Sequence, residues 1–291
     1  MKNESVAILA DVLDLTKPRI VALSLLMATL GFVLGSQPGS LGSSLYFLTI
    51  LGLALIGGGC GALNHYLERD TDAKMHRTRN RPLPTGRLQP SVALVVGFAS
   101  VALGELVLLM GVNAITAVLG GLTLLFYIGV YTPAKRTSSM STLVGAIPGA
   151  MPPLMGWTAV QGKISIEGLL LFAILFMWQI PHFLAIAWIY REDYARAGFP
   201  ILSVIDEDGI ATAKQVVLYS MVLLPLTMVP SIWGITGYFY FFGALALGTI
   251  FLAFSIILAL YRSKLHARRL FLVSILYLPL LGILMAWDRG L

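Results

Sequence analysis

The sequence has few charged residues and a single cysteine. Only 12% of its 291 residues are Asp, Glu, Lys or Arg, whereas soluble domains contain about 25%. A protein of this composition would aggregate in water through its apolar patches, so a soluble globular fold is excluded. Disorder needs the opposite composition and is excluded as well. The lone cysteine, Cys60, excludes an internal disulfide and a cysteine-based metal cluster.

Apolar residues make up 57% of the chain and gather in long runs. A run such as GLLLFAILFMW lacks the alternation of a transmembrane β-barrel strand, so we predict an all-α integral membrane protein. Because a helix needs about 20 apolar residues to cross a bilayer, we expect nine transmembrane helices in a single bundle around a central cavity. Their approximate ranges are 18–36, 43–66, 91–110, 113–131, 142–161, 166–190, 214–236, 238–261 and 269–287.

The basic residues predict the orientation of this bundle. If the N-terminus is cytoplasmic, all but two of the 20 Lys and Arg residues fall on the inner face, the exceptions being Lys163 and Arg289. Lys and Arg concentrate in cytoplasmic loops, so a cytoplasmic N-terminus is expected. Residues 1–16 are expected to form an amphipathic segment on the membrane surface. Residues 17–291 then form the nine-helix domain, with two similar halves (helices 1–4 and 5–8) and helix 9.

A first acidic cluster follows the second span. Asn64, Glu68 and Asp72 are spaced four residues apart. Each step of four rotates a helical side chain by only about 40°, so a helix that continues to this point carries all three oxygens on one stripe. Such hard oxygen ligands suit Mg²⁺, which prefers a few carboxylates together with substrate phosphates. Asp70 falls on a different face.

Basic residues follow this cluster directly, at Lys74, Arg77, Arg79 and Arg81. Arginine offers planar paired donors to phosphate oxygens, so acids followed by arginines favour a metal–diphosphate ligand. Taken alone, the arginines also fit a solvated cytoplasmic loop. Lys135 and Arg136, after the fourth span, fit an anion site and a topological signal equally well.

A second acidic cluster ends the sixth span, with Glu192 and Asp193. A carboxylate here can hold another side of a metal–diphosphate assembly. His182 and Trp178 are neighbours on one helical face, and His182 lies about two turns before the end of the predicted span at 190. A polar ring at that depth faces the bundle interior. His182 fits a substrate contact, an iron ligand or a proton donor, and equally an interhelical hydrogen bond.

Three blocks of sequence together resemble the UbiA superfamily of intramembrane prenyltransferases. That superfamily has an Asn-x-x-x-Asp-x-x-x-Asp type motif after its second span and another acidic motif after its sixth. The blocks, most similar to the branch that farnesylates haem, are NHYLERDTDAKMHRTRNRPLP, YTPAKRTSSMSTLVGAIPGAMPPLMGW and WQIPHFLAIAWIYREDYARAGFP. Two positions depart from the superfamily pattern: Glu68 replaces the usual Asp, and Ile189 stands four residues before Asp193 where an acid is expected. The second departure favours the haem branch.

The resemblance implies Mg²⁺-dependent transfer of a farnesyl group from farnesyl diphosphate to a vinyl group of haem B. Addition of water then gives haem O, and diphosphate leaves. The residues implied to hold Mg²⁺ are Asn64, Glu68, Asp72 and Asp193. The residues implied to stabilise the leaving anion are Arg77, Lys135 and Arg136. The residues implied to bind substrate or line the porphyrin cavity are Arg81, Tyr131, Trp178, His182 and Trp188.

The resemblance also implies a bacterial or archaeal cytoplasmic membrane, with the active site facing the cytoplasm. The expected partners are farnesyl diphosphate, haem B as a substrate and the lipid bilayer, with no nucleic acid. A downstream haem-modifying membrane enzyme is a further partner to consider, and the oligomeric state stays open. The alternatives are a quinone-pathway prenyltransferase acting on a hydroxybenzoate or naphthoate, a transporter, and a scaffold. A transporter usually places ionisable groups at the membrane midplane, where this sequence offers only Glu105.

Overall fold

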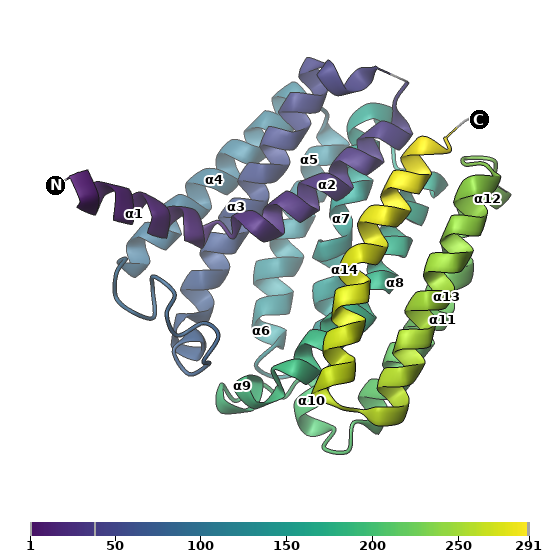
Figure 1. Cartoon of the computed structure of the whole chain (residues 1–291). Helices are drawn as coiled ribbons and strands as arrows, with labels where there is room; N and C mark the ends of the chain where they lie inside the picture. The colour runs from purple at the N-terminus through teal and green to yellow at the C-terminus, as the bar shows by residue number, and fades with distance from the viewer. Residues whose placement is uncertain (1, 38, 290–291) are drawn as a thin grey trace.

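The computed structural model describes residues 2–37 and 39–289, and in this part of the chain it contains helices and no strands (Figure 1). The helices are α1 (Lys2–Leu15), α2 (Pro18–Gly35), η1 (Ser40–Gly42), α3 (Ser44–Asp72), α4 (Pro90–Gly111), α5 (Ala114–Leu124), η2 (Leu125–Tyr131), α6 (Thr132–Ala134), α7 (Ser141–Gln161), α8 (Ile166–Ile189), α9 (Arg191–Arg196), α10 (Leu202–Ile205), α11 (Ile210–Leu226), α12 (Val229–Ile232), α13 (Tyr238–Tyr261) and α14 (Lys264–Trp287).

Within the described residues, nine helical segments are long and apolar enough to cross a membrane, as predicted. Three spans differ from the predicted ranges by four residues or more, and one of them is the ninth, which begins at Lys264 rather than 269. The second span continues as α3 to Asp72 rather than ending near 66. The seventh begins at Ile210 rather than 214. Its earlier start has a local cause, because Asp206 Oδ2 accepts a hydrogen bond from the backbone N–H of Thr212 at 2.6 Å and caps the helix.

Glycine allows α3 to pack against α4 with the two backbones in contact. A Cβ atom added at Gly59 would lie 2.7 Å from the carbonyl oxygen of Gly97, closer than real side chains approach. Small residues at such positions let membrane helices associate without intervening lipid. This packing positions α3, whose C-terminal part carries the acidic stripe of Asn64, Glu68 and Asp72.

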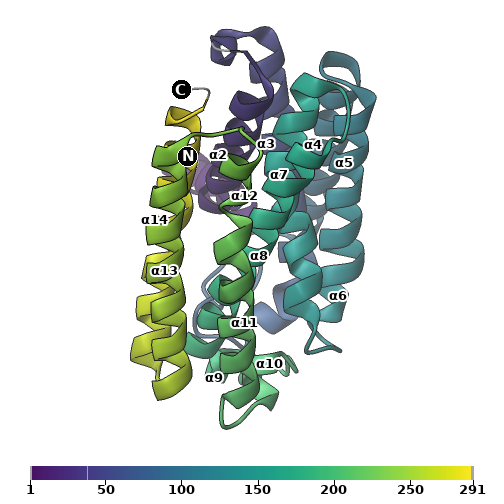
Figure 2. The same ribbon diagram turned by 90° about the vertical axis from the view of Figure 1, so that its right-hand side faces the viewer.

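The loops rich in basic residues gather at one end of the bundle (Figures 1 and 2). The segment 73–89, α6, α9 and α10 all lie at this end, whereas η1, α12 and the C-terminal end of α14 lie at the other. We refer to the first as the basic end. The loops at the basic end connect the second span to the third, the fourth to the fifth and the sixth to the seventh. Both acidic clusters therefore lie on the same side of the bundle.

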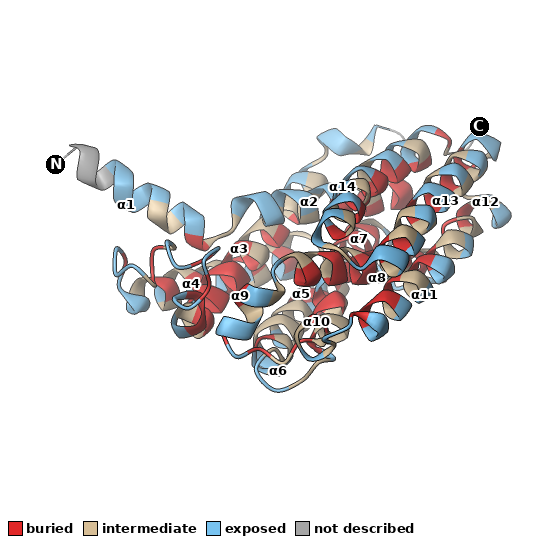
Figure 3. Ribbon diagram, turned by 60° about the horizontal axis from the view of Figure 1, so that its bottom comes forward, coloured by how far each residue is buried: buried red, intermediate tan, exposed pale blue. Residues whose placement is uncertain are grey.

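Helix α1 projects from the bundle beside this end, and much of its described length is exposed (Figure 3). Its exposed residues include Val6, Ile8, Leu9 and Leu13. The guanidinium of Arg87 binds Asp11 with an Nε–Oδ2 distance of 3.0 Å, which ties α1 to the loop after the second span. An apolar face on a helix beside a membrane bundle suits the lipid interface.

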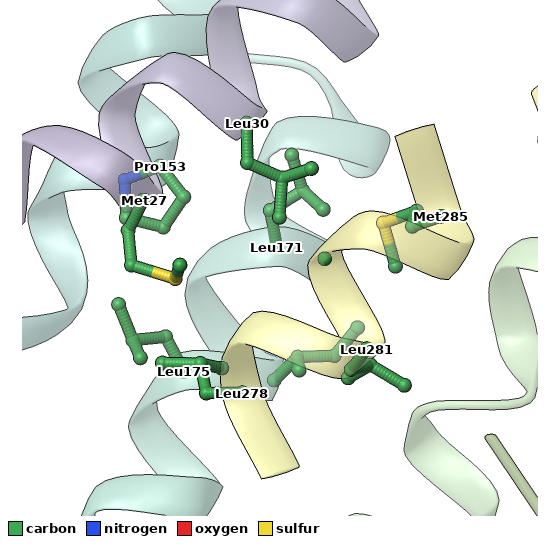
Figure 4. A pocket seen from close by; sticks show the side chains of 10 residues that line it. Met27, Leu30, Pro153, Leu171, Leu175, Leu278, Leu281 and Met285 are labelled. Carbon is green, nitrogen blue, oxygen red and sulfur yellow. The ribbon is translucent and has the colours of Figure 1, made fainter. Parts of the chain in front are cut away.

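The bundle interior holds a small apolar void between α2, α7, α8 and α14 (Figure 4). Its lining includes Met27, Pro153, Leu175 and Leu281. The space accommodates about one water molecule. This void is therefore far too small for a porphyrin.

Candidate functional site

The acidic stripe of α3 is buried at the basic end of the bundle. Asn64, Glu68 and Asp72 retain only 1%, 4% and 1% of their exposed surface. Because α3 is helical to Asp72, the three side chains lie on one face, one turn apart. Asp70, in contrast, is exposed. Buried carboxylates need charged partners or a metal ion to offset the cost of leaving water.

Basic residues from three other segments meet this stripe. Lys135 Nζ lies 2.7 Å from Glu68 Oε1, and Arg81 Nη1 lies 2.7 Å from Asp72 Oδ2. Lys17 Nζ donates to Asn64 Oδ1 at 2.5 Å. The three cations outnumber the two carboxylates, so the stripe is buried in a net positive environment that favours an anionic ligand.

Lys17 is a site residue that was not singled out from the sequence. This lysine directly precedes α2 and adopts a left-handed backbone conformation with φ of 51°, which is costly for any residue except glycine. Burial lowers the pKa of its ammonium to about 8, although the Glu68 charge opposes this change. Strained non-glycine residues often lie at functional sites. The only sequence signal is a lysine at the exact boundary of the first span.

A π-helical turn in the fourth span supports Asn64. Thr132 follows this turn, η2, and its Oγ1 accepts a hydrogen bond from Asn64 Nδ2 at 3.2 Å. The same hydroxyl donates to the Tyr127 carbonyl oxygen at 2.8 Å. Lys17 Nζ lies 3.5 Å from the Tyr127 hydroxyl. Asn64 is thus held from both sides, with its amide oxygen toward Lys17. Thr132 and Tyr127 were not singled out in the sequence.

Tyr131 lies in the same π-helical turn and faces the lysine of the site. Its ring stacks on Tyr127 with centroids 5.5 Å apart, and Lys135 Nζ lies 5.4 Å from the Tyr131 centroid. Although burial opposes the charged form of Lys135, Tyr131 and the Glu68 carboxylate raise its pKa above the ordinary value. Lys135 is therefore a permanently charged group at the centre of the site.

The second acidic cluster is joined to the loop that follows the first. Asp193 is buried in α9, and its Oδ1 accepts a hydrogen bond from the backbone N–H of His76 at 3.2 Å. Burial opposes its ionisation, but this N–H and the Arg196 guanidinium hold the pKa of Asp193 below its usual value. Met75 packs against Phe199 in the same small cluster. The two predicted clusters thus share one compact region.

Arg77 lies at the exposed edge of this region. Its Nη2 donates to the hydroxyl of Tyr194 at 3.3 Å, and its guanidinium lies 5.0 Å from the ring centroid of Tyr190. Arg136, by contrast, is exposed and donates to the carbonyl oxygen of Leu67 at 2.6 Å. Of the adjacent basic pair after the fourth span, only Lys135 contacts the acidic stripe.

The three aromatic residues predicted on the sixth span lie elsewhere in the bundle. Trp178 donates from Nε1 to the Ser274 carbonyl oxygen at 3.1 Å, and His182 Nδ1 lies 2.6 Å from Ser274 Oγ. Both therefore face α14. Trp188 donates to the carbonyl oxygen of Arg262 at 3.1 Å, beyond the end of α13. None of these contacts involves the acidic stripe.

The donor set fits a magnesium ion that shares its coordination with a phosphate. Asp72 Oδ1 is buried and has no hydrogen-bond partner in the described part of the chain. Among the described residues, no three His, Cys, Asp or Glu side chains come together as a metal site. Glu68, Asp72 and the Asn64 amide instead supply a partial set. Mg²⁺ commonly binds through one or two carboxylates, waters and substrate phosphates, so this set suits it.

Comparison with known proteins is consistent with this geometry. The model of the UbiA prenyltransferase family matches residues 24–278. Over 289 residues the chain is 46% identical to "Protoheme IX farnesyltransferase" of Solibacter usitatus, covering 96% of this chain and 98% of that protein.

Two solved structures have the same fold at low identity. A structure of digeranylgeranylglyceryl phosphate synthase has a TM-score of 0.80 at 15% identity, covering 96% of this chain and 98% of that one. A UbiA homologue from Archaeoglobus fulgidus bound to GPP and Mg²⁺ has a TM-score of 0.68 at 16% identity, covering 94% and 99%. The chain is therefore an integral membrane prenyltransferase that belongs to the UbiA family.

Proposed function

We propose that this enzyme transfers the farnesyl group of farnesyl diphosphate to a vinyl group of haem B, giving haem O and diphosphate. The buried pairing of two carboxylates and one amide with three cations carries the proposal. The name of the Solibacter usitatus relative, at 46% identity, supports haem as the acceptor. The Archaeoglobus fulgidus homologue bound to GPP and Mg²⁺ supports a prenyl diphosphate donor and a divalent ion.

In this proposal, Glu68, Asp72 and Asn64 would hold Mg²⁺, with Asp193 on the adjoining side. When bound, the ion would supply positive charge to the diphosphate oxygens and so make the diphosphate a better leaving group. Lys17, Lys135 and Arg81 exchange part of their contact with the acidic stripe for contact with the diphosphate. Arg77 and Arg136 stand nearer the surface and attract the anion toward the site. Fixed charges of this kind supply a large share of many enzymes' rate enhancement.

The covalent step breaks the bond between farnesyl C1 and the diphosphate oxygen, and the electron pair leaves with the diphosphate. The terminal vinyl carbon of haem then forms a bond to C1. The positive charge left on the inner vinyl carbon is captured by water, which loses a proton to give the hydroxyl group. Tyr131 shields the developing cation, and Trp178, His182 and Trp188 remain the proposed boundary of the porphyrin site. Excluding water until the carbon–carbon bond has formed prevents loss of the farnesyl group to hydrolysis.

In this proposal, the active site lies at the basic end of the bundle. The distribution of Lys and Arg supports placing that end in the cytoplasm, in the cytoplasmic membrane of a bacterium or archaeon. Farnesyl diphosphate would then reach the site from the cytosol with its head group, while its tail enters the membrane.

The test is product formation by the purified full-length protein in lipid. Haem B, farnesyl diphosphate and Mg²⁺ are supplied, and the porphyrin is read by mass spectrometry, with 4-hydroxybenzoate replacing haem in a parallel reaction. Haem gaining one farnesyl group and one hydroxyl group supports the proposal. Prenylation of the hydroxybenzoate alone would move the enzyme to the quinone pathway. Glu68→Gln serves as the inactive control, and Lys264→Gln, which alters an exposed ion pair, as the active one.

A further inference from the structure

A groove on the outside of the bundle runs between α11 and α13, away from the acidic stripe. Most of its lining is apolar and includes Val217, Leu218, Met221 and Leu260. Leu218, Met221 and Leu260 are more than half exposed, at 57%, 55% and 69%. Because both helices are candidate membrane spans, this exposed apolar surface lies against lipid chains.

Two basic residues also line the groove, which distinguishes it from three other grooves of the bundle. They are Lys214, in the second turn of α11, and Arg262, which directly follows α13. Both are exposed, and within the described residues neither side chain has a hydrogen-bond or ion-pair partner. The grooves beside α4 and beside α2 are lined by apolar and uncharged polar residues instead.

In the described part of the chain, no acidic side chain forms an ion pair with Lys214 or Arg262, although Asp206, Glu207 and Asp208 precede α11. Asp206 accepts hydrogen bonds from the backbone N–H groups of Ala211 and Thr212. Asp208 accepts from the backbone N–H of Ile210. Both carboxylates are thus engaged with the first turn of α11. The two cations at the mouth of the groove remain available for an external anion.

The backbone of Arg262 indicates that its side chain matters at this position. Arg262 has φ of 47°, in the left-handed region, where glycine is the favoured residue at a helix C-terminus. Its carbonyl oxygen accepts the hydrogen bond from Trp188 Nε1 at 3.1 Å, which fixes this turn. A glycine would satisfy the backbone equally well. The turn itself therefore does not require an arginine, and we attribute the arginine to the charge of its side chain.

We propose that this groove is a binding site for an anionic phospholipid. Its acyl chain lies along the apolar lining and its phosphate contacts Lys214 and Arg262. Charge complementarity identifies the occupant, because the site pairs an apolar groove with two cations that lack an ion-pair partner in the described residues, at the level where a span leaves the membrane. Anionic leaflets attract such juxtamembrane cations. The site is independent of the prenyl transfer and would exist whichever acceptor the enzyme uses.

The experiment titrates the full-length protein in mild detergent with dioleoyl phosphatidylglycerol or dioleoyl phosphatidylcholine, and reads bound lipid by native mass spectrometry. We expect tighter binding of phosphatidylglycerol, and about fivefold weaker binding for each cation removed by Lys214→Gln or Arg262→Gly. Arg262→Gly relieves the backbone strain, so it should lose lipid without losing thermal stability. The matched control is Arg268→Gln with Arg269→Gln, two exposed basic residues of α14 outside the groove.

Four results would overturn the proposal, the last of them from a groove-filling variant. The first is equal affinity for the two lipids. The second is a loss of phosphatidylglycerol binding in the Arg268 and Arg269 control as large as in the groove variants. The third is full competition by inorganic phosphate, which would show that the acyl chain contributes nothing. Met221→Trp fills the groove but keeps both cations, and it should weaken the binding of phosphatidylglycerol; unchanged affinity would exclude the groove as the place of the chain.

Discussion

The pair of Glu68 and Lys135 should contribute both to stability and to catalysis, and a double-mutant cycle separates the two. Their charged atoms are 2.7 Å apart, and the two side chains are only 5% and 12% exposed. Glu68→Gln leaves the Lys135 ammonium buried without its counterion. Removing one partner of a buried pair costs about 3–5 kcal/mol. We expect the lower part of this range, about 3 kcal/mol, because the glutamine oxygen still accepts a hydrogen bond.

Replacing both partners should recover part of this loss. In Glu68→Gln combined with Lys135→Met, no unpaired charge remains between these positions, so the double variant should be more stable than Glu68→Gln alone. A coupling energy of about 2 kcal/mol is expected for residues in direct contact. Turnover should not recover. Glu68→Gln should lower kcat by orders of magnitude, whereas Lys135→Ala should chiefly raise KM for farnesyl diphosphate.

Stability is measured by denaturant unfolding in detergent and turnover by mass spectrometry of the porphyrin product. The matched control is the ion pair of Glu192 and Lys264, which has the same 2.7 Å separation but is exposed. Exposed pairs contribute little, so Lys264→Gln should leave stability and turnover unchanged. If the stability losses of Glu68→Gln and Lys135→Met alone simply add in the double variant, the two side chains are not coupled. Normal turnover in the double variant would show that the pair has no catalytic role.

Other perturbations test neighbouring parts of the same structure. Asp72→Asn, which keeps a hydrogen bond to Arg81 but removes the charge, should lower turnover by at least about 10²-fold in the same product assay without preventing membrane insertion. EDTA should abolish product formation and added Mg²⁺ should restore it; full activity in metal-free buffer would exclude a metal. Thr132→Val, which frees the Asn64 amide, should cost about 1 kcal/mol of unfolding free energy and reduce kcat, and Thr132→Ser should restore both. Asp206→Ala should cost about 1 kcal/mol of stability with turnover intact, through loss of the α11 cap. Burial opposes ionisation of Asp206, but the Thr212 and Ala211 N–H groups lower its pKa, so the stabilisation is present at neutral pH and is lost as pH falls through the folded-state pKa; a pH-independent difference would argue against this cap.

The parts of the site that follow helical periodicity could be predicted from the sequence. The span count depends on apolar length, and nine spans were found in the described residues. The common face of Asn64, Glu68 and Asp72 depends only on a spacing of four and on α3 remaining helical to its end. Local rules of this kind need no knowledge of the neighbouring helices.

The partners of that stripe could not be predicted in this way. Lys17, Arg81 and Lys135 are separated from it by loops or by other spans, and no periodicity relates their positions to Asn64. The same limit applies to α8. Trp178 and His182 do share a face, as their spacing predicts, but the packing of α14 decides that this face meets Ser274.

The conformation of Lys17 links the fold to the chemistry of the site. A lysine in the left-handed region immediately before Pro18 is unfavourable on its own, and its burial adds a further cost. Both costs are offset only if the ammonium is needed where it lies, 2.5 Å from the Asn64 amide oxygen. The Asn64 amide oxygen and the Glu68 and Asp72 charges offset part of these costs, and a diphosphate entering beside Asn64 would offset more of them. The strained turn before α2 is therefore best explained as part of the anion site rather than as a means of starting the first span.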